Sequence, residues 1–179
     1  MRRRALLTTA LAAGLAAHAA APAAAQGLLE RLAGTGVGAS AFVQAAAIIN
    51  NFEIDSSRIV LARSAHPQIR DFAQRMIDQH TAMSAELRAN PEATTRLPTA
   101  LDERHTNMLL VLHQQPDVDL LHRYFVQQQI EAHEEAITAF EAYANGGDVP
   151  SLRSFAQRHL PTLREHLQLA RALQVRPAE

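Results

Sequence analysis

The chain has 179 residues, is 47% hydrophobic and 20% charged, and contains no cysteine, which excludes disulfides, thiolate metal sites and cysteine catalysis. Its length suits one domain with a sizeable core, and its few glycines, prolines and aromatic residues favour helix over sheet. The formal net charge of −1 provides no polybasic patch, so no nucleic-acid partner is expected.

Residues 1–25 have the organisation of a secretory signal peptide. Three arginines at positions 2–4 precede an alanine-rich apolar run over about residues 5–21, and Ala23 and Ala25 form a small-residue cleavage pattern. This run is too short and too rich in alanine to span a bilayer comfortably. We therefore expect an exported mature chain without a transmembrane span, located in the periplasm or peripherally at the outer membrane. Both the general secretory and the twin-arginine export routes remain open.

Five helices are predicted after a glycine-containing lead-in over residues 26–39. They cover about residues 40–64, 67–89, 99–114 and 117–144, and a last segment from residue 150 to before Pro177. Pro67 and Pro150 suit a first helical turn, where no amide donor is needed. Gly146 and Gly147 are expected to end the fourth helix. Pro161 lies inside the last helix and is expected to kink it.

Two sequence motifs repeat at an offset of 83 residues. Phe42-Val43-Gln44 recurs as Phe125-Val126-Gln127, and the segment 70–75 (RDFAQR) recurs at 153–158 (RSFAQR). Two matches at one offset indicate a duplicated helical hairpin. We predict an all-α, ferritin-like four-helix bundle over residues 40–174, built from two repeated hairpins with 99–114 as a short connecting helix, followed by a tail at 175–179. Parallel and antiparallel docking of the two hairpins are both possible.

Each main helix carries a polar or ionisable side chain on the stripe that is expected to face the core. The candidate set is Glu53, His80, His133 and His166. At 1.5 Å per residue, Glu53 and His80 lie at nearly the same distance from the first hairpin turn. His133 and His166 likewise lie at nearly the same distance from the second turn. One carboxylate and three imidazoles from four helices suit one divalent ion: zinc, iron, manganese or copper. These four residues are the predicted metal ligands.

Several other polar residues are given structural roles. Histidines at helix ends or off the stripes are expected at the surface: His66, His105, His113 and His122. His159 lies on the stripe of the last helix and is a possible member of the polar core. Four acids are expected on solvated helix faces, with an outer-sphere role as the alternative: Asp78, Glu131, Glu134 and Glu165. The alternative to a metal site is a metal-free polar core in which Glu53 pairs with an imidazolium.

The usual sequence patterns of bundle enzymes are absent. Di-iron proteins use Glu-x-x-His, but Ile77 stands three residues before His80, and Leu163 stands three residues before His166. The chain also contains no Gly-x-Ser-x-Gly, no phosphate-binding glycine loop and no His-Glu-x-x-His. No reaction can be assigned from these patterns. A non-enzymatic role is favoured, and a redox enzyme, which would need an open coordination position and a cavity, is a third possibility.

Two motifs resemble a known family. Phe-Ala-Gln-Arg-Met-Ile-Asp-Gln-His at 72–80 and Leu-Pro-Thr-Leu-Arg-Glu-His-Leu at 160–167 are similar to the bacterial domain-of-unknown-function family 4142. The likeness covers about residues 41–173. It implies a ferritin-like fold in an exported, periplasmic or outer-membrane protein without an established activity.

The resemblance also implies a set of site positions. The family pattern has a glutamate, two Asp-His pairs and a histidine after Leu-Pro-Thr-Leu, which match Glu53, His80, His133 and His166. The chain departs from this pattern at Gln79 and Ala132, where aspartates would stand. The expected function is the binding of one divalent metal ion in envelope metal handling or stress tolerance. The alternative is a non-enzymatic adaptor with a metal-free polar core, which binds an envelope partner or forms a homo-oligomer.

Overall fold

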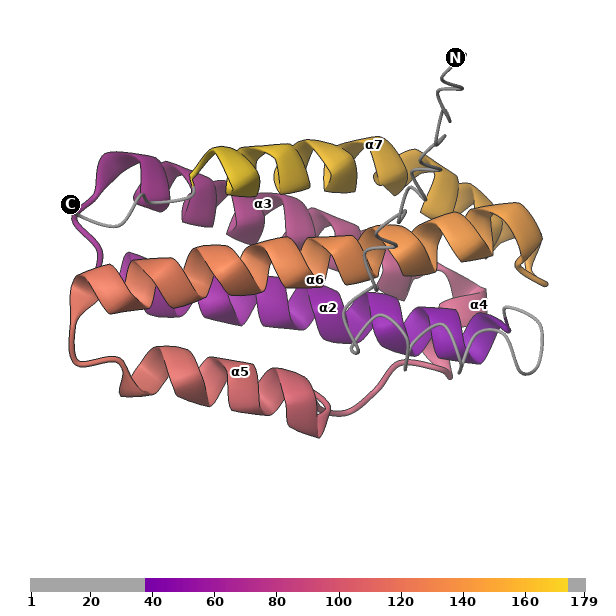
Figure 1. Ribbon diagram of the computed structural model, residues 1–179. Coiled ribbons are helices and arrows are strands. Elements are labelled where there is room, and N and C mark those ends of the chain that lie inside the picture. The colour runs from indigo at the N-terminus through magenta and orange to yellow at the C-terminus, as the bar shows by residue number, and fades with distance from the viewer. Residues whose placement is uncertain (1–37, 174–179) are drawn as a thin grey trace, which may run out of the picture.

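The computed structural model describes residues 38–173, which contain six helices and no strand (Figure 1). The helices are α2 (Ala39–Leu61), α3 (Pro67–Ala89), α4 (Pro91–Thr94), α5 (Glu103–Gln114), α6 (Val118–Gly146) and α7 (Pro150–Ala172). The prediction of an all-α fold is confirmed. The predicted signal peptide, most of the lead-in and the tail lie outside the described residues.

The helix boundaries follow local chemistry. Pro67 and Pro150 occupy the first turns of α3 and α7, as predicted. The carboxylate of Asp102 accepts a hydrogen bond from the amide of His105, and Asp117 caps α6 in the same way. The one-turn helix α4 was not predicted, and it begins where the Asn90 side chain accepts a hydrogen bond from the amide of Glu92. Helix α7 continues through Pro161.

The four long helices lie side by side, and α5 lies against α2 and α6 (Figure 1). Helices α2 and α3 form one hairpin, and α6 and α7 form the other. At one end of the molecule, the ring of Phe42 stacks on that of Tyr143 with centroids 4.1 Å apart. At the other end, His122 Nε2 lies 2.8 Å from Ser64 Oγ in the α2–α3 turn. The start of α2 therefore lies beside the end of α6, so the two hairpins dock antiparallel.

The repeated motifs contact each other across the two hairpins. Phe42 packs on Phe155, and their counterparts Phe125 and Phe72 pack on each other, with ring centroids 6.3 Å and 6.0 Å apart. Each pair joins the first helix of one repeat to the second helix of the other. This crossed pattern is the one expected of two equivalent hairpins related by an approximate two-fold axis.

The core consists of two apolar clusters with a polar layer between them. One cluster surrounds Phe42, Phe140 and Phe155, and the other surrounds Phe72 and Phe125. The polar layer comprises buried side chains from the middle of the long helices: Asn50, Glu53, Ser56, Ser57, His80, Ser84, Gln129, His133 and His166. In residues 38–173, no helix has both the length and the apolar character needed to cross a membrane.

Candidate metal centre

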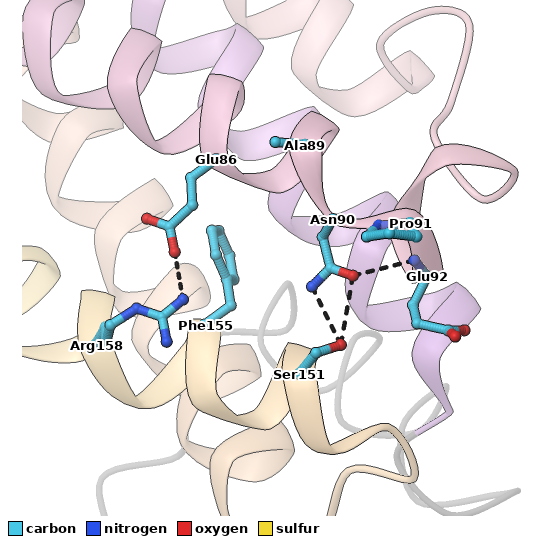
Figure 2. Close-up of a pocket in the computed structure, with 8 residues that line it drawn as sticks. All are labelled: Glu86, Ala89, Asn90, Pro91, Glu92, Ser151, Phe155 and Arg158. Carbon is cyan, nitrogen blue, oxygen red and sulfur yellow. Dashed lines mark hydrogen bonds and ion pairs between the residues drawn. The ribbon is translucent and has the colours of Figure 1, made fainter.

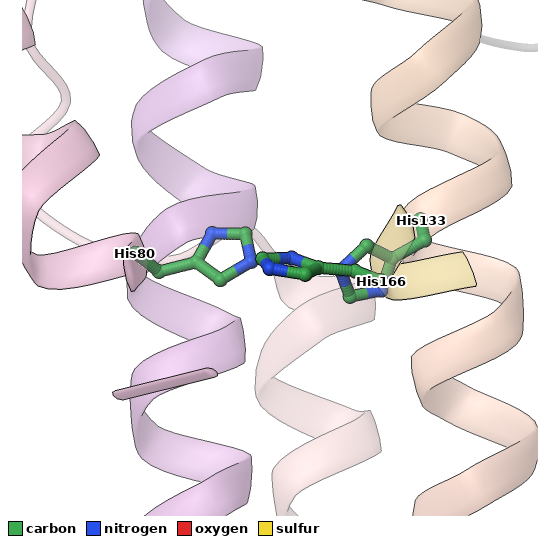
Figure 3. A group of neighbouring side chains, drawn as sticks. All are labelled: His80, His133 and His166. Atoms are coloured by element: carbon green, nitrogen blue, oxygen red, sulfur yellow. The ribbon is translucent and has the colours of Figure 1, made fainter. Parts of the chain in front are cut away.

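Three of the four predicted ligands meet at the centre of the polar layer. His80 comes from α3, His133 from α6 and His166 from α7, and all three side chains are inaccessible to solvent. One ring nitrogen of each lies within 4.8 Å of the corresponding nitrogens of the other two (Figure 3). The prediction that they lie at one height in the bundle is therefore correct for these three.

Each imidazole is oriented by a hydrogen bond through its other nitrogen. His80 Nδ1 lies 2.8 Å from Asn50 Oδ1, and His133 Nδ1 lies 2.7 Å from the main-chain oxygen of Gln129. His166 Nε2 contacts Gln79 Oε1. All three partners are oxygen acceptors, so in each neutral ring the nitrogen facing the partner carries the proton. The remaining nitrogens, His80 Nε2, His133 Nε2 and His166 Nδ1, then present lone pairs.

Two of these lone pairs face each other at short range. His133 Nε2 and His166 Nδ1 are 3.2 Å apart, and His80 Nε2 has no hydrogen-bond partner. Without a proton or a cation between them, facing lone pairs repel. Two zinc–nitrogen bonds of about 2.0–2.1 Å at a tetrahedral angle place their nitrogens about 3.3 Å apart. The spacing of this pair therefore fits two ligands of one metal ion.

Glu53, the fourth predicted ligand, lies on the other side of His133. Its Oε1 is 3.4 Å from His133 Nδ1, both side chains are inaccessible to solvent, and Glu53 is not a member of the three-histidine group. Neither carboxylate oxygen has a hydrogen-bond partner. Helix α2 contacts the histidine group through Asn50 instead, one turn before Glu53. Glu53 therefore contacts the histidine group through His133 alone.

The electrostatics of the layer are dominated by burial. Burial lowers the pKa of His133 to about 4 and that of His166 to about 3. Burial also lowers the pKa of His80 well below its ordinary value, and the neighbouring histidines lower it further. The pKa of Glu53 is raised by burial well above its ordinary value, although the Gln129 side chain opposes the rise. At neutral pH the rings are therefore neutral, which disfavours the alternative of an imidazolium paired with Glu53 and leaves the lone pairs free to bind a cation.

Two of the four histidines expected at the surface are buried. His105 is 1% exposed and contacts its own helix cap Asp102, and His122 is 6% exposed and contacts Ser64. The predictions were wrong because α5 covers this side of α2 and the α2–α3 turn encloses the start of α6. His66 and His113 are exposed, as predicted.

The remaining candidates lie outside the histidine group. His159 Nε2 is 2.8 Å from Glu86 Oε2, so this histidine bonds a surface acid instead. The four acids considered as outer partners all contact other surface side chains: Asp78 contacts Gln74, Glu131 contacts Gln127, Glu134 contacts Arg171, and Glu165 contacts Arg75. None of these contacts involves a member of the histidine group.

Sequence reasoning assigned no role to the three residues that orient the rings. Asn50 lies three residues before Glu53, on the same face of the helix, and this spacing was the available signal. Gln79 stands beside the stripe, where the family resemblance indicates an aspartate, and its amide oxygen still accepts a hydrogen bond from His166. Gln129 contacts His133 through its main-chain oxygen, and because every residue has such an oxygen, the sequence could not identify this partner.

The family resemblance is supported by direct comparison. A family model described as a domain of unknown function, DUF4142, matches residues 16–173. The chain belongs to the DUF4142 family. No curated protein and no solved structure matches this DUF4142 chain.

Proposed function

We propose that this DUF4142 chain is an exported protein that binds one divalent first-row transition-metal ion through His80, His133 and His166. The observation that carries the proposal is the convergence of three ring nitrogens within 4.8 Å of one another, while the other nitrogen of each ring is held by Asn50, Gln79 or the Gln129 carbonyl. Neutral imidazole suits zinc, copper and iron. Zinc is the first ion to test, because the 3.2 Å nitrogen spacing fits its tetrahedral bonds.

Glu53 is the group that can compensate the charge of a bound ion, because a divalent cation beside this buried carboxyl favours its ionised form over the neutral form that burial favours. It is the single acid among the buried polar side chains of residues 38–173, and both of its oxygens lack hydrogen-bond partners. A buried divalent ion held by three neutral rings carries an uncompensated double charge, which a nearby carboxylate reduces. We keep Glu53 as the fourth protein group of the site, bound either to the ion or to His133 Nδ1. X-ray absorption of the metal-loaded protein distinguishes three nitrogen ligands from three nitrogens and one oxygen.

Burial favours retention of the ion over catalysis. Catalytic zinc sites keep a coordination position open to water or substrate, whereas structural sites are closed. Here the three histidines and Glu53 are inaccessible to solvent, and two apolar clusters enclose the layer. This supports a role in holding metal in the cell envelope, in metal handling or stress tolerance.

The test is the metal content and metal affinity of the mature chain, purified without a histidine tag. We expect about one metal ion per chain by elemental analysis. In the Co²⁺-loaded protein we expect intense visible absorption bands, as for a tetrahedral ligand field. The His133→Ala variant should lose both, whereas His113→Ala, which removes an exposed histidine from α5, should keep both.

A different result would overturn the proposal. If the unaltered protein and His133→Ala both lack metal, fail to bind added Zn²⁺ or Co²⁺ and keep their helical circular dichroism, the polar layer is structural. The alternative function, an adaptor that binds an envelope partner, would then be the one to pursue.

A further inference from the structure

A fully buried ion needs a route from solvent, and a pocket of about 520 Å³ opens on the surface of the bundle. It forms where α3, α4 and α7 meet, and its lining includes Glu86, Asn90, Phe155 and Arg158 (Figure 2). Glu86 follows His80 by six residues on α3, which is about 9 Å along the helix axis. The pocket therefore begins about two turns from the site.

A metal-binding pair of side chains stands beside this pocket. Glu86 forms an ion pair with Arg158 on the surface and also contacts His159, whose Nε2 lies 2.8 Å from Glu86 Oε2. The ring of His159 packs on Phe155 with centroids 4.5 Å apart, and its side chain is 18% exposed. His159 thus contacts a carboxylate at the pocket and lies on α7 two turns before His166.

A buried polar atom without a partner lies between Glu86 and His80 in height along α3. Ser84 is 4% exposed, and its Oγ has no hydrogen-bond partner. It follows His80 by one turn on α3 and precedes Glu86 by two residues. His80 Nε2 is also without a partner. Along the axis of α3, the Ser84 side chain therefore stands about 6 Å and the Glu86 side chain about 9 Å from His80, next to the buried side chains of Met83 and Leu163.

We propose that Glu86 and His159 form an entry site, which captures a divalent cation from solvent and passes it along Ser84 to the three histidines. This inference rests on the proposed function. On capture, the cation replaces the guanidinium of Arg158 on Glu86, and the N–H proton of the neutral His159 ring moves from Nε2 to Nδ1, so that Nε2 can bind the cation. Arg158 therefore competes with the incoming cation for Glu86.

The test is the rate of Zn²⁺ exchange in the full mature chain. Association is followed by stopped-flow mixing with Zn²⁺, and dissociation by transfer to excess chelator. Glu86→Gln and His159→Gln should each slow association and dissociation by the same factor, about tenfold, and leave the equilibrium Kd unchanged. Arg158→Gln should accelerate both rates. The matched control is Glu165→Gln, which breaks the Arg75–Glu165 surface ion pair between the same two helices and should change neither rate.

Three outcomes would overturn the entry site, and a fourth concerns the function itself. Unchanged rates in Glu86→Gln and His159→Gln would show that the ion enters elsewhere. A change of the same sign in Glu86→Gln and Arg158→Gln would indicate a structural effect of breaking the ion pair. A weaker Kd in His159→Gln would make this histidine a ligand of the final site. If the unaltered chain binds no Zn²⁺ at equilibrium, the proposed function fails, and the entry site fails with it.

Discussion

Neutral amide and carbonyl oxygens, rather than carboxylates, orient the three rings. Metal-bound histidines commonly donate their second N–H to a carboxylate, a main-chain carbonyl or water. Here Asn50, Gln79 and the Gln129 carbonyl accept those protons. A neutral acceptor fixes the tautomer without adding charge, so Glu53 remains the single buried acidic side chain of residues 38–173, next to the histidine group. The charge of the site is therefore set at one position.

The contact of Gln79 with His166 can be tested by removing the acceptor. In Gln79→Leu the His166 N–H loses its partner, which should lower the free energy of unfolding by about 1–3 kcal/mol. Loss of ring orientation should weaken metal binding by about 10–100-fold. Urea unfolding and chelator competition measure the two effects. Gln74→Leu, which removes an exposed glutamine from the same helix, should change neither, and an equal loss in both variants would contradict the role of Gln79.

The site residues on α2 illustrate what a sequence can and cannot specify. Asn50 and Glu53 are three residues apart, so both lie on the inward face, and periodicity alone does not say which one meets His80. The choice depends on the rotation of α2 against α3, which the packing of whole side chains determines. The three histidines were predictable because each is a polar residue on a strong apolar stripe.

The repeat accounts for much of the architecture at the level of the helices. Arg70 and Arg153 are counterparts at the offset of 83, and each donates to main-chain carbonyls at the end of the preceding helix: Arg70 to Leu61 and Ser64, and Arg153 to Gly147. The proline-started helices and the hairpins were predictable because their signals are local. Helix α4 and the burial of His105 and His122 were not, because they depend on where the connecting segment packs.

The turn between α6 and α7 provides a matched pair of glycines. A Cβ at Gly147 would lie 2.5 Å from Tyr143 Cε1, and this ring is held by its stacking on Phe42 and its hydrogen bond to Asp148. Gly147→Ala should therefore lower the free energy of unfolding by about 1–3 kcal/mol. Gly146, the last residue of α6, has no atom within 4 Å of that position.

Gly146→Ala is the control for this prediction. It should be neutral or stabilising by up to about 1 kcal/mol, because alanine is the better helix former. Urea denaturation of both variants measures the difference. Equal effects at the two positions would contradict the steric argument.

The whole molecule places ionisable groups between two apolar clusters, so stability must depend on pH. A histidine whose folded pKa is lowered contributes stability that is complete above its unfolded pKa near 6.5 and is lost as pH falls. This sign applies to His80, His133 and His166. Glu53 has the opposite sign, because its raised folded pKa lowers stability as pH rises above its unfolded value.

We predict that the metal-free protein loses stability between pH 7.5 and pH 5. With a folded pKa of about 4, His133 alone should account for about 2 kcal/mol of this loss. Urea unfolding with chelator present measures it, and His133→Gln should show a smaller dependence on pH. Added Zn²⁺ should raise the Tm at pH 7.5 far more than at pH 5, because protons compete for the same nitrogens. Because Glu53 acts in the opposite direction over the same range, the comparison with His133→Gln is decisive, and an equal dependence on pH in the two proteins would contradict the neutral histidine layer.

The crossed contacts of Phe42 with Phe155 and of Phe72 with Phe125 have an evolutionary consequence. Because each aromatic contact joins the two repeats, one hairpin alone holds half of every such pair, and two copies of an ancestral hairpin would complete both as a symmetric homodimer. The present chain has the organisation of that dimer fused into one polypeptide. Fusion allows counterpart positions to diverge, and Asn50 and His133, which are 83 residues apart, have done so: one orients a ring and the other is a proposed ligand. A site that takes one histidine from the first repeat and two from the second can form in a fused chain, but not in a symmetric dimer of identical subunits.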